Sequence, residues 1–238
     1  MKTKKIFLIL SLCIFFAFVW FMQNNVYIGD PTDRNLISMN NSAFGYSSLM
    51  AYMLFYPLPF LLLFNMFYQA DNIMVITRFP KRWIWYRLII IKIMFLAFIY
   101  AGLHTLVNIF FTLIFFNIEL LRQMHFFYIA LANMFVLTLF FSSIGIINRL
   151  ITDLINKSVG LSMFFSYMFI GILYFIEKLI FPSTPWAPLK DLALFYYLLN
   201  NEWNMMHFLL VFTRQVLIVV LLYLIGSWAI SRKDIMND

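Results

Sequence analysis

Three polar side chains recur at intervals of four residues in the apolar stretch AGLHTLVNIFFTL: His104, Asn108 and Thr112. In an α-helix, this spacing places all three on one face. If the helix is embedded in lipid, its polar groups usually face the protein interior or a cavity. Two interpretations stay open: hydrogen bonds to neighbouring helices, or a face that lines a transport path or a dimer interface.

A second candidate site is an ion pair between apolar segments. Arg214 lies inside the run HFLLVFTRQVLIVVLLYLIGSWAI, and Glu177 lies near the end of the preceding apolar run. A cation within the hydrocarbon costs roughly 2.5–3.5 kcal/mol on insertion scales unless it reaches water or a partner. Arg214 can extend toward the outer interface, or it can pair with Glu177 or Glu202. We predict the pair with Glu177.

Motifs for enzymatic chemistry are missing from the sequence. The chain has no HExxH, no GxSxG, no paired glutamates and no glycine-rich phosphate loop. Its three histidines lie far apart in sequence, without a cysteine at ligand spacing. We therefore expect no catalytic residues, no metal and no cofactor. The chain is expected not to be an enzyme and not to hydrolyse ATP by itself.

The composition requires lipid as the solvent. The chain has 238 residues, of which 64% are hydrophobic and 11% are charged, whereas about a quarter of the residues in a soluble domain are charged. The net charge of +7 is better explained by positively charged cytoplasmic loops than by a nucleic-acid surface. The single cysteine, Cys13, excludes an internal disulfide framework.

We predict one all-α membrane domain with six transmembrane helices. A bilayer core about 30 Å thick needs about 20 helical residues, and continuous apolar runs favour helices over barrel strands. The predicted spans are residues 6–22, 48–68, 88–116, 127–147, 159–180 and 207–229. The first run is interpreted as a retained helix, because no small-x-small cleavage site follows it.

Basic residues predict the orientation of these spans. With the N-terminus inside the cell, most of the 17 lysines and arginines lie on the cytoplasmic side, as the positive-inside rule favours. We therefore predict an N-in/C-in arrangement. The proline-rich outer region, residues 181–206, is too apolar for a free loop. It is predicted to contain an interfacial or re-entrant helix.

A basic and aromatic stretch, ITRFPKRWIWYRLIIIK, joins the second and third predicted spans. It suits a nucleic-acid surface, a membrane-interface anchor or a docking element for another protein. The membrane composition disfavours the first, and an anchor explains the residue types. An anchor does not explain the length of the cytoplasmic region 69–87. There, Asp71 can cap a short helix, NIMVITRF, that Pro80 ends.

The order of these residues resembles the ABC-2-type transporter permeases. In that family, a cytoplasmic coupling helix joins the second and third spans. That helix has an acidic residue near its start, followed by a motif of Thr or Ser, Pro and Arg. A lysine then begins the next span, and here it is Lys92. The acidic residue is Asp rather than the usual Glu, and Ile91 replaces the usual small residue. The resemblance implies that the ATPase contacts are Asp71, Ile73, Val75, Ile76, Thr77, Arg78, Pro80 and Arg82.

The rest of the chain agrees with this resemblance. The stretch SSIGIINRLITDLINKSVGLSMFF is similar to the family's link between the fourth and fifth spans. The resemblance implies a permease subunit in a bacterial plasma membrane, working as a homo- or heterodimer with two copies of a separate ABC ATPase that binds the ATP. Analogy with small bacteriocin and immunity permeases favours export of a peptide or an amphipathic, lipid-like substrate. The alternative is a stand-alone immunity or scaffold protein without an ATPase.

Overall fold

The computed structural model describes residues 2–29, 32–41, 45–67, 82–155, 159–180 and 188–232, which form helices and no strand. The long helices are α1 (Lys2–Asn24), α5 (Arg82–Phe115), α7 (Phe126–Ile155), α8 (Val159–Ile180) and α10 (Met205–Arg232). The short ones are η1 (Asn25–Tyr27), α2 (Asp33–Asn41), η2 (Ala51–Phe55), α3 (Pro57–Phe67), α6 (Ile118–Gln123), η3 (Pro188–Ala193) and α9 (Leu194–Leu199). The all-α prediction is confirmed for the described residues.

Five helices are long and apolar enough to cross a membrane. The candidate spans are Phe7–Tyr27, Trp83–Phe115, Phe126–Leu154, Val159–Leu179 and Met205–Ser231. Large apolar side chains such as Phe95, Leu179 and Leu210 remain exposed on the outer faces of these helices. Water would disfavour this exposure, whereas lipid chains solvate it. The helices therefore indicate a multi-pass membrane protein.

The segment predicted to span the membrane over residues 48–68 takes a different form. Its apolar helical part is Ala51–Phe67, which is shorter than the roughly 20 residues that a bilayer core requires. It is divided into the π-helix η2 and the α-helix α3. Pro57 and Pro59 explain the break, because neither residue offers a backbone N–H to a helical hydrogen bond. Among the described residues, five helices thus reach the length of a full span, and the six-span topology stays a prediction.

Tyrosine side chains take over hydrogen bonding at this break. The backbone N–H of Tyr56 donates to the Ala51 carbonyl at 2.9 Å, which is the π-helical spacing. The Tyr167 hydroxyl donates to the Leu54 carbonyl at 2.9 Å. The Tyr100 hydroxyl donates to the carbonyl of Tyr56, also at 2.9 Å. Because unpaired backbone groups are costly in lipid, these bonds allow an irregular segment to sit inside the bundle.

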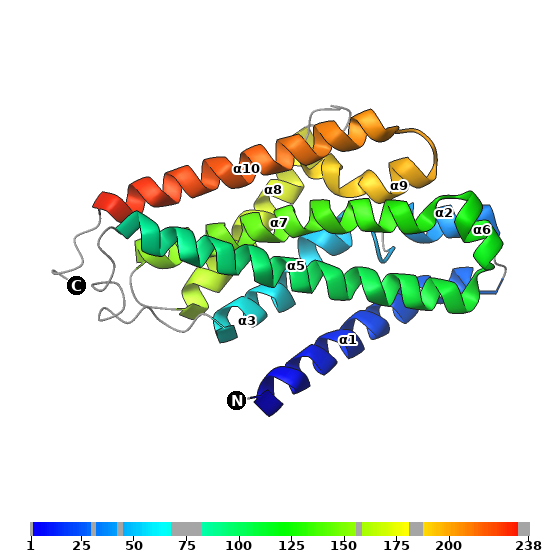
Figure 1. Cartoon of the computed structure of the whole chain (residues 1–238), viewed down its shortest axis with the longest axis horizontal. Helices are drawn as coiled ribbons and strands as arrows, with labels where there is room; N and C mark the ends of the chain where they lie inside the picture. Colours follow the sequence, from blue (N-terminus) through cyan, green and yellow to red (C-terminus); the bar gives the residue numbers. More distant parts are fainter. Residues whose placement is uncertain are drawn as a thin grey trace.

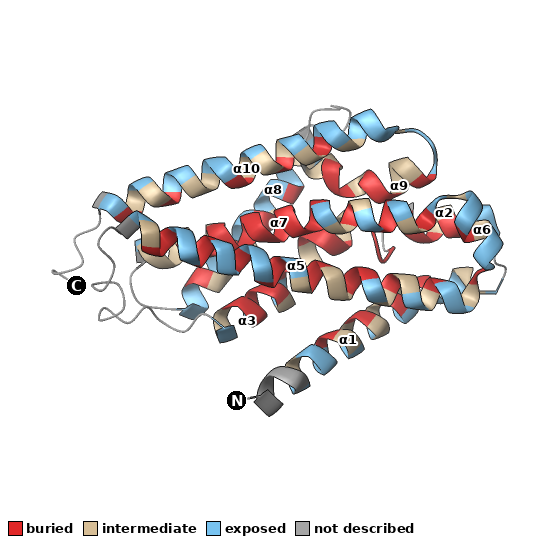
Figure 2. Cartoon of the chain, viewed as in Figure 1, coloured by how far each residue is buried: buried red, intermediate tan, exposed pale blue. Residues whose placement is uncertain are grey.

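Helix α7 forms the centre of the bundle (Figure 1). Helices α5, α8 and α10 pack against it, and α1 meets α5 obliquely. Buried positions concentrate on α7 and on the helix faces that meet it, whereas much of α1 and α10 is exposed (Figure 2). Helices α2, α6 and α9 gather at one end of the bundle, opposite the end where α5 begins and α10 terminates (Figure 1). The hydrophobic core therefore surrounds α7.

Helix α10 approaches α5 closely at Gly226. A Cβ atom added there would lie 2.5 Å from Cζ of Tyr86. Tyr86 is fully buried, and its ring stacks on Tyr223 with 6.0 Å between the centroids. The tyrosine ring therefore has little room to move aside, and the close approach of the two helices depends on the missing side chain.

We expect Gly226→Ala to lower the free energy of unfolding by about 1–3 kcal/mol, the usual cost of overpacking a core. The matched control is Gly171→Ala on α8, where an added Cβ meets nothing within 4 Å. There, the better helix propensity of alanine favours the folded state by up to ~1 kcal/mol. Thermal unfolding of the purified protein in detergent compares the two variants. Equal midpoints would contradict the close approach at Gly226.

Candidate functional site

The first candidate site is the polar face of α5. His104, Asn108 and Thr112 are buried there. The indole Nε1 of Trp20 on α1 donates to Asn108 Oδ1 at 3.0 Å, and Thr112 Oγ1 lies 3.5 Å from the same oxygen. The structure thus places the three residues on one buried face that meets α1. Their role in lining a path or a dimer interface stays a prediction.

Four aromatic rings surround the imidazole of His104. The Tyr46 ring stacks on it at a centroid distance of 4.3 Å and an interplanar angle of 8°. Phe16 and Tyr56 make T-shaped contacts with it at 5.4 Å and 4.9 Å, and Tyr52 lies tilted at 5.5 Å. We call these four residues the aromatic cage. It separates the imidazole from the surroundings of the bundle.

Hydrogen bonds hold the aromatic cage against α5 and α7. The Tyr46 hydroxyl donates to the His104 carbonyl at 3.0 Å, and the Tyr56 hydroxyl donates to the carbonyl of Tyr46 at 2.9 Å. From α7, Asn133 Nδ2 donates to Tyr52 Oη at 3.0 Å. Sequence reasoning missed these residues, because tyrosines within apolar runs resemble side chains at a membrane interface. Their repetition just before the double-proline break is a signal that could have revealed them.

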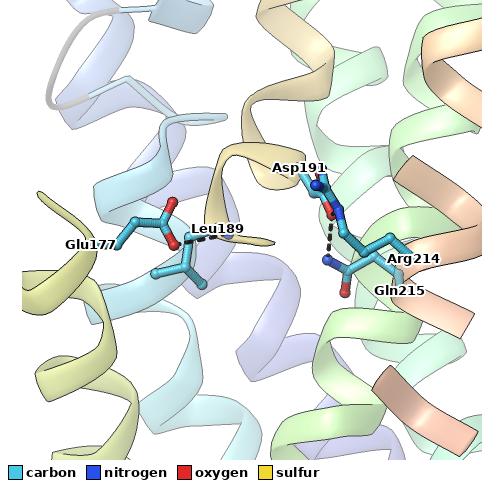
Figure 3. A network of polar contacts seen from close by, with 5 residues as sticks. All are labelled: Glu177, Leu189, Asp191, Arg214 and Gln215. Carbon is cyan, nitrogen blue, oxygen red and sulfur yellow. Dashed lines mark hydrogen bonds and ion pairs between the residues drawn. The ribbon is translucent and has the colours of Figure 1, made fainter. Parts of the chain in front are cut away.

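The second candidate site joins α10 to η3 (Figure 3). Arg214 Nε donates to Asp191 Oδ2 at 2.8 Å, and Arg214 Nη2 contacts Asp191 Oδ1. The guanidinium therefore binds both carboxylate oxygens, a geometry that favours strong charge-assisted bonds. Gln215 Nε2 also donates to Asp191 Oδ2, at 3.0 Å. We call these three residues the Asp191–Arg214 latch.

The predicted ion pair between Glu177 and Arg214 was wrong. Glu177 lies on α8, and η3 stands between it and Arg214 (Figure 3). Its Oε2 accepts a hydrogen bond from the backbone N–H of Leu189 at 3.1 Å. The cause is tertiary, because the chain after α8 folds back into the bundle and presents Asp191 to the guanidinium. Glu177 and the latch thus hold the same short segment from two different helices.

Burial dominates the electrostatics of Asp191, which is 0% exposed. Desolvation raises the pKa of its carboxyl above the ordinary value, while the contacts with Arg214 and Gln215 lower it in part. A guanidinium stays charged at any ordinary pH and favours the ionised form of a carboxylate bound to it. We therefore assign the contact as an ion pair. Its effect is to anchor η3 and α9 to α10.

The residues implied to contact an ATPase fall almost entirely outside the described part of the chain. Those outside it are Asp71, Ile73, Val75, Ile76, Thr77, Arg78 and Pro80. Arg82 is the first residue of α5. One turn further along, the Arg149 guanidinium of α7 lies 5.1 Å from the centroid of the Trp85 ring and pairs with Asp153 at 2.8 Å. The contact with Trp85 ties the start of α5 to the end of α7, and the pair with Asp153 lies within α7.

Among the described residues, no group of three or more His, Cys, Asp or Glu side chains is arranged to hold a metal ion. Comparison of the chain with protein-family models, with curated proteins and with solved structures found no match. The function is therefore inferred from the residues and their arrangement.

Proposed function

We propose that this chain is the membrane-spanning permease subunit of an ATP-driven exporter of the ABC-2 type, located in a bacterial plasma membrane. ATP is bound and hydrolysed by two copies of a separate ABC ATPase, and the cytoplasmic segment between α3 and α5 couples that hydrolysis to the bundle. The proposal is supported by the five long apolar helices and by the order of residues from Asp71 to Lys92 in the sequence.

The observation that carries the proposal is the segment after α8. Helices η3 and α9 bury Leu192, Phe195 and Leu199 and pack against α7, instead of forming an outer loop. In the family that the sequence resembles, outer re-entrant helices are expected at this point of the chain. The Asp191–Arg214 latch gives a physical reason for the segment to keep its place while neighbouring helices move.

A path for cargo is proposed to form between two permease subunits. Within one chain, His104, Asn108 and Thr112 are buried. The exposed apolar faces of α1, α8 and α10 are available to lipid, to a second subunit, identical or different, and to a cargo with apolar surface. This arrangement favours a peptide or an amphipathic, lipid-like substrate over a hydrophilic one.

The orientation is tested by labelling single cysteines in a Cys13→Ser background. In intact cells, an impermeant thiol reagent is expected to label cysteines placed at Asn25, which is exposed at the start of η1, and at Asn201, which is exposed in the turn after α9. It is expected not to label cysteines at Asn72 and Lys157, because these positions lie in predicted cytoplasmic segments. Labelling at Asn72 would reverse the orientation and remove the basis for a cytoplasmic coupling helix.

The transport function is tested with the ABC ATPase encoded nearest to this chain. We expect the two proteins to purify as a complex and the permease to change the rate of ATP hydrolysis in lipid nanodiscs. An ATPase with its phosphate-loop lysine replaced provides the inactive control. A folded permease that neither binds the ATPase nor alters its rate would favour the alternative, a stand-alone immunity or scaffold protein.

A further inference from the structure

Both ring nitrogens of His104 are buried, and neither makes a hydrogen bond of ordinary geometry among the described residues, although the Tyr46 backbone lies close to the ring. A neutral imidazole carries one N–H donor and one acceptor nitrogen. Buried polar groups in folded proteins are nearly always paired, either with protein atoms or with ordered water. Two unpaired positions on a single ring, enclosed by the aromatic cage, therefore need a physical explanation.

Asn133 of α7 shows the same feature on the other side of Tyr52. Its Nδ2 donates to Tyr52 Oη, but its buried Oδ1 has no partner within the described part of the chain. The hydroxyl of Ser47, next to the stacked Tyr46, is also buried and lies beside the Tyr52 side chain. Because the Tyr52 ring also contacts His104, the unpaired groups of α5 and α7 approach the same tyrosine. Donors and acceptors are thus concentrated around one point of the bundle.

The polar side chains one turn before and one turn after His104 on α5 make protein contacts, whereas the hydroxyl of Thr105, the next residue, is buried and unpaired within the described part of the chain. One turn after His104, Asn108 receives hydrogen bonds from Trp20 and Thr112. One turn before it, the Tyr100 hydroxyl donates to a backbone carbonyl. Helix packing at this depth therefore allows polar side chains to be paired. The turn that carries His104 differs because the aromatic cage surrounds the imidazole with rings. The faces of those rings cannot form hydrogen bonds with the two nitrogens in the imidazole plane.

We propose that His104 and Asn133 form a binding site for internal water, enclosed by the aromatic cage. Water donates and accepts hydrogen bonds at once, as an imidazole and an amide oxygen together require. The π-helix η2 supplies Tyr52 to the cage, and irregular helices of this kind are frequent at functional sites. This site is independent of the proposed ATPase coupling, because it lies inside a single chain.

Radiolytic labelling in heavy-oxygen water tests the site directly. A short X-ray pulse makes hydroxyl radicals where water lies, so a buried ring is modified only when water is beside it. Mass spectrometry of the full chain in nanodiscs is expected to find heavy oxygen on His104 and Tyr52 at levels several-fold above Phe141. Phe141 is similarly buried, but in an apolar cluster with Phe60. Tyr128, which is 76% exposed, is the upper reference.

The variant His104→Phe keeps a ring of similar shape and removes both nitrogens. It is expected to reduce labelling of Tyr52 to the level of Phe141. The matched control, Trp20→Phe, removes a bond on the next turn and should leave Tyr52 labelling unchanged. Labelling of His104 and Tyr52 no higher than Phe141 in the unmodified protein would show a dry cage and overturn the proposal. Unchanged Tyr52 labelling in His104→Phe would equally overturn it, since the water would not depend on His104.

Discussion

Replacing Arg214 with glutamine is expected to lower the free energy of unfolding by about 3 kcal/mol, as is typical when one partner of a buried ion pair is removed. The substitution leaves the Asp191 carboxylate, which is 0% exposed, without the guanidinium that binds both of its oxygens. We therefore expect η3 and α9 to loosen from α10. Equilibrium unfolding of the purified protein in mixed micelles measures the loss.

The two partners of this latch are expected to respond unequally. The Arg214 side chain is 25% exposed, so after Asp191→Asn the guanidinium can reach water or headgroups, and the loss should be smaller. The double variant Arg214→Gln/Asp191→Asn should be more stable than Arg214→Gln alone, because no charge is left buried. Glu177→Gln is the matched control, since an amide oxygen can still accept from Leu189. If Glu177→Gln is as damaging as Arg214→Gln, the latch does not explain the stability.

Arg78→Glu and Ile76→Asp are each expected to abolish coupling between transport and ATP hydrolysis, or to lose the ATPase during purification. Both residues lie between predicted spans, so membrane insertion should be unaffected. If the segment docks on the ATPase, a charge reversal there typically costs several kcal/mol of binding. The measurements are the amount of ATPase retained on the purified permease and the rate of ATP-driven transport.

Lys4→Glu is the control for this experiment. It changes the charge on the same predicted cytoplasmic side by the same amount without touching the proposed docking segment. If the basic stretch is only a lipid anchor, its effect depends on total charge and aromatic content. Lys4→Glu and Arg78→Glu should then behave alike. If the ATPase stays bound and coupled in both variants, the basic stretch is an anchor and the proposal loses its coupling element.

Local periodicity alone was sufficient to predict part of the fold. Long apolar runs identify the five full-length candidate spans, because a helix in lipid must satisfy its own backbone and expose apolar side chains. The spacing of His104, Asn108 and Thr112 likewise predicted that they share a helix face, since that face follows from the geometry of a single helix. Their burial against α1 agrees with the cost of polar groups in lipid.

The prolines of the second predicted span show where such reasoning stops. Pro57 and Pro59 predict a kink, but the sequence does not tell whether a broken helix still crosses the membrane. In the structure a π-helix precedes the prolines. The Tyr167 hydroxyl pairs the Leu54 carbonyl, and the Tyr56 carbonyl accepts from both the Tyr100 hydroxyl and the backbone N–H of Phe60. Tyr100 and Tyr167 come from α5 and α8, so the outcome depended on helix packing.

The sequence by itself determined the all-helical membrane architecture and the polar face that His104, Asn108 and Thr112 share on α5. Only the tertiary structure decided which charges pair and which rings enclose His104. Arg214 meets Asp191 rather than Glu177 because the chain after α8 folds back. The aromatic cage draws on two separate stretches of sequence, α1 and residues 46–56, which meet at a histidine of α5. Periodicity reports the faces of single helices, whereas pairing between them is set by how the whole bundle fills its interior.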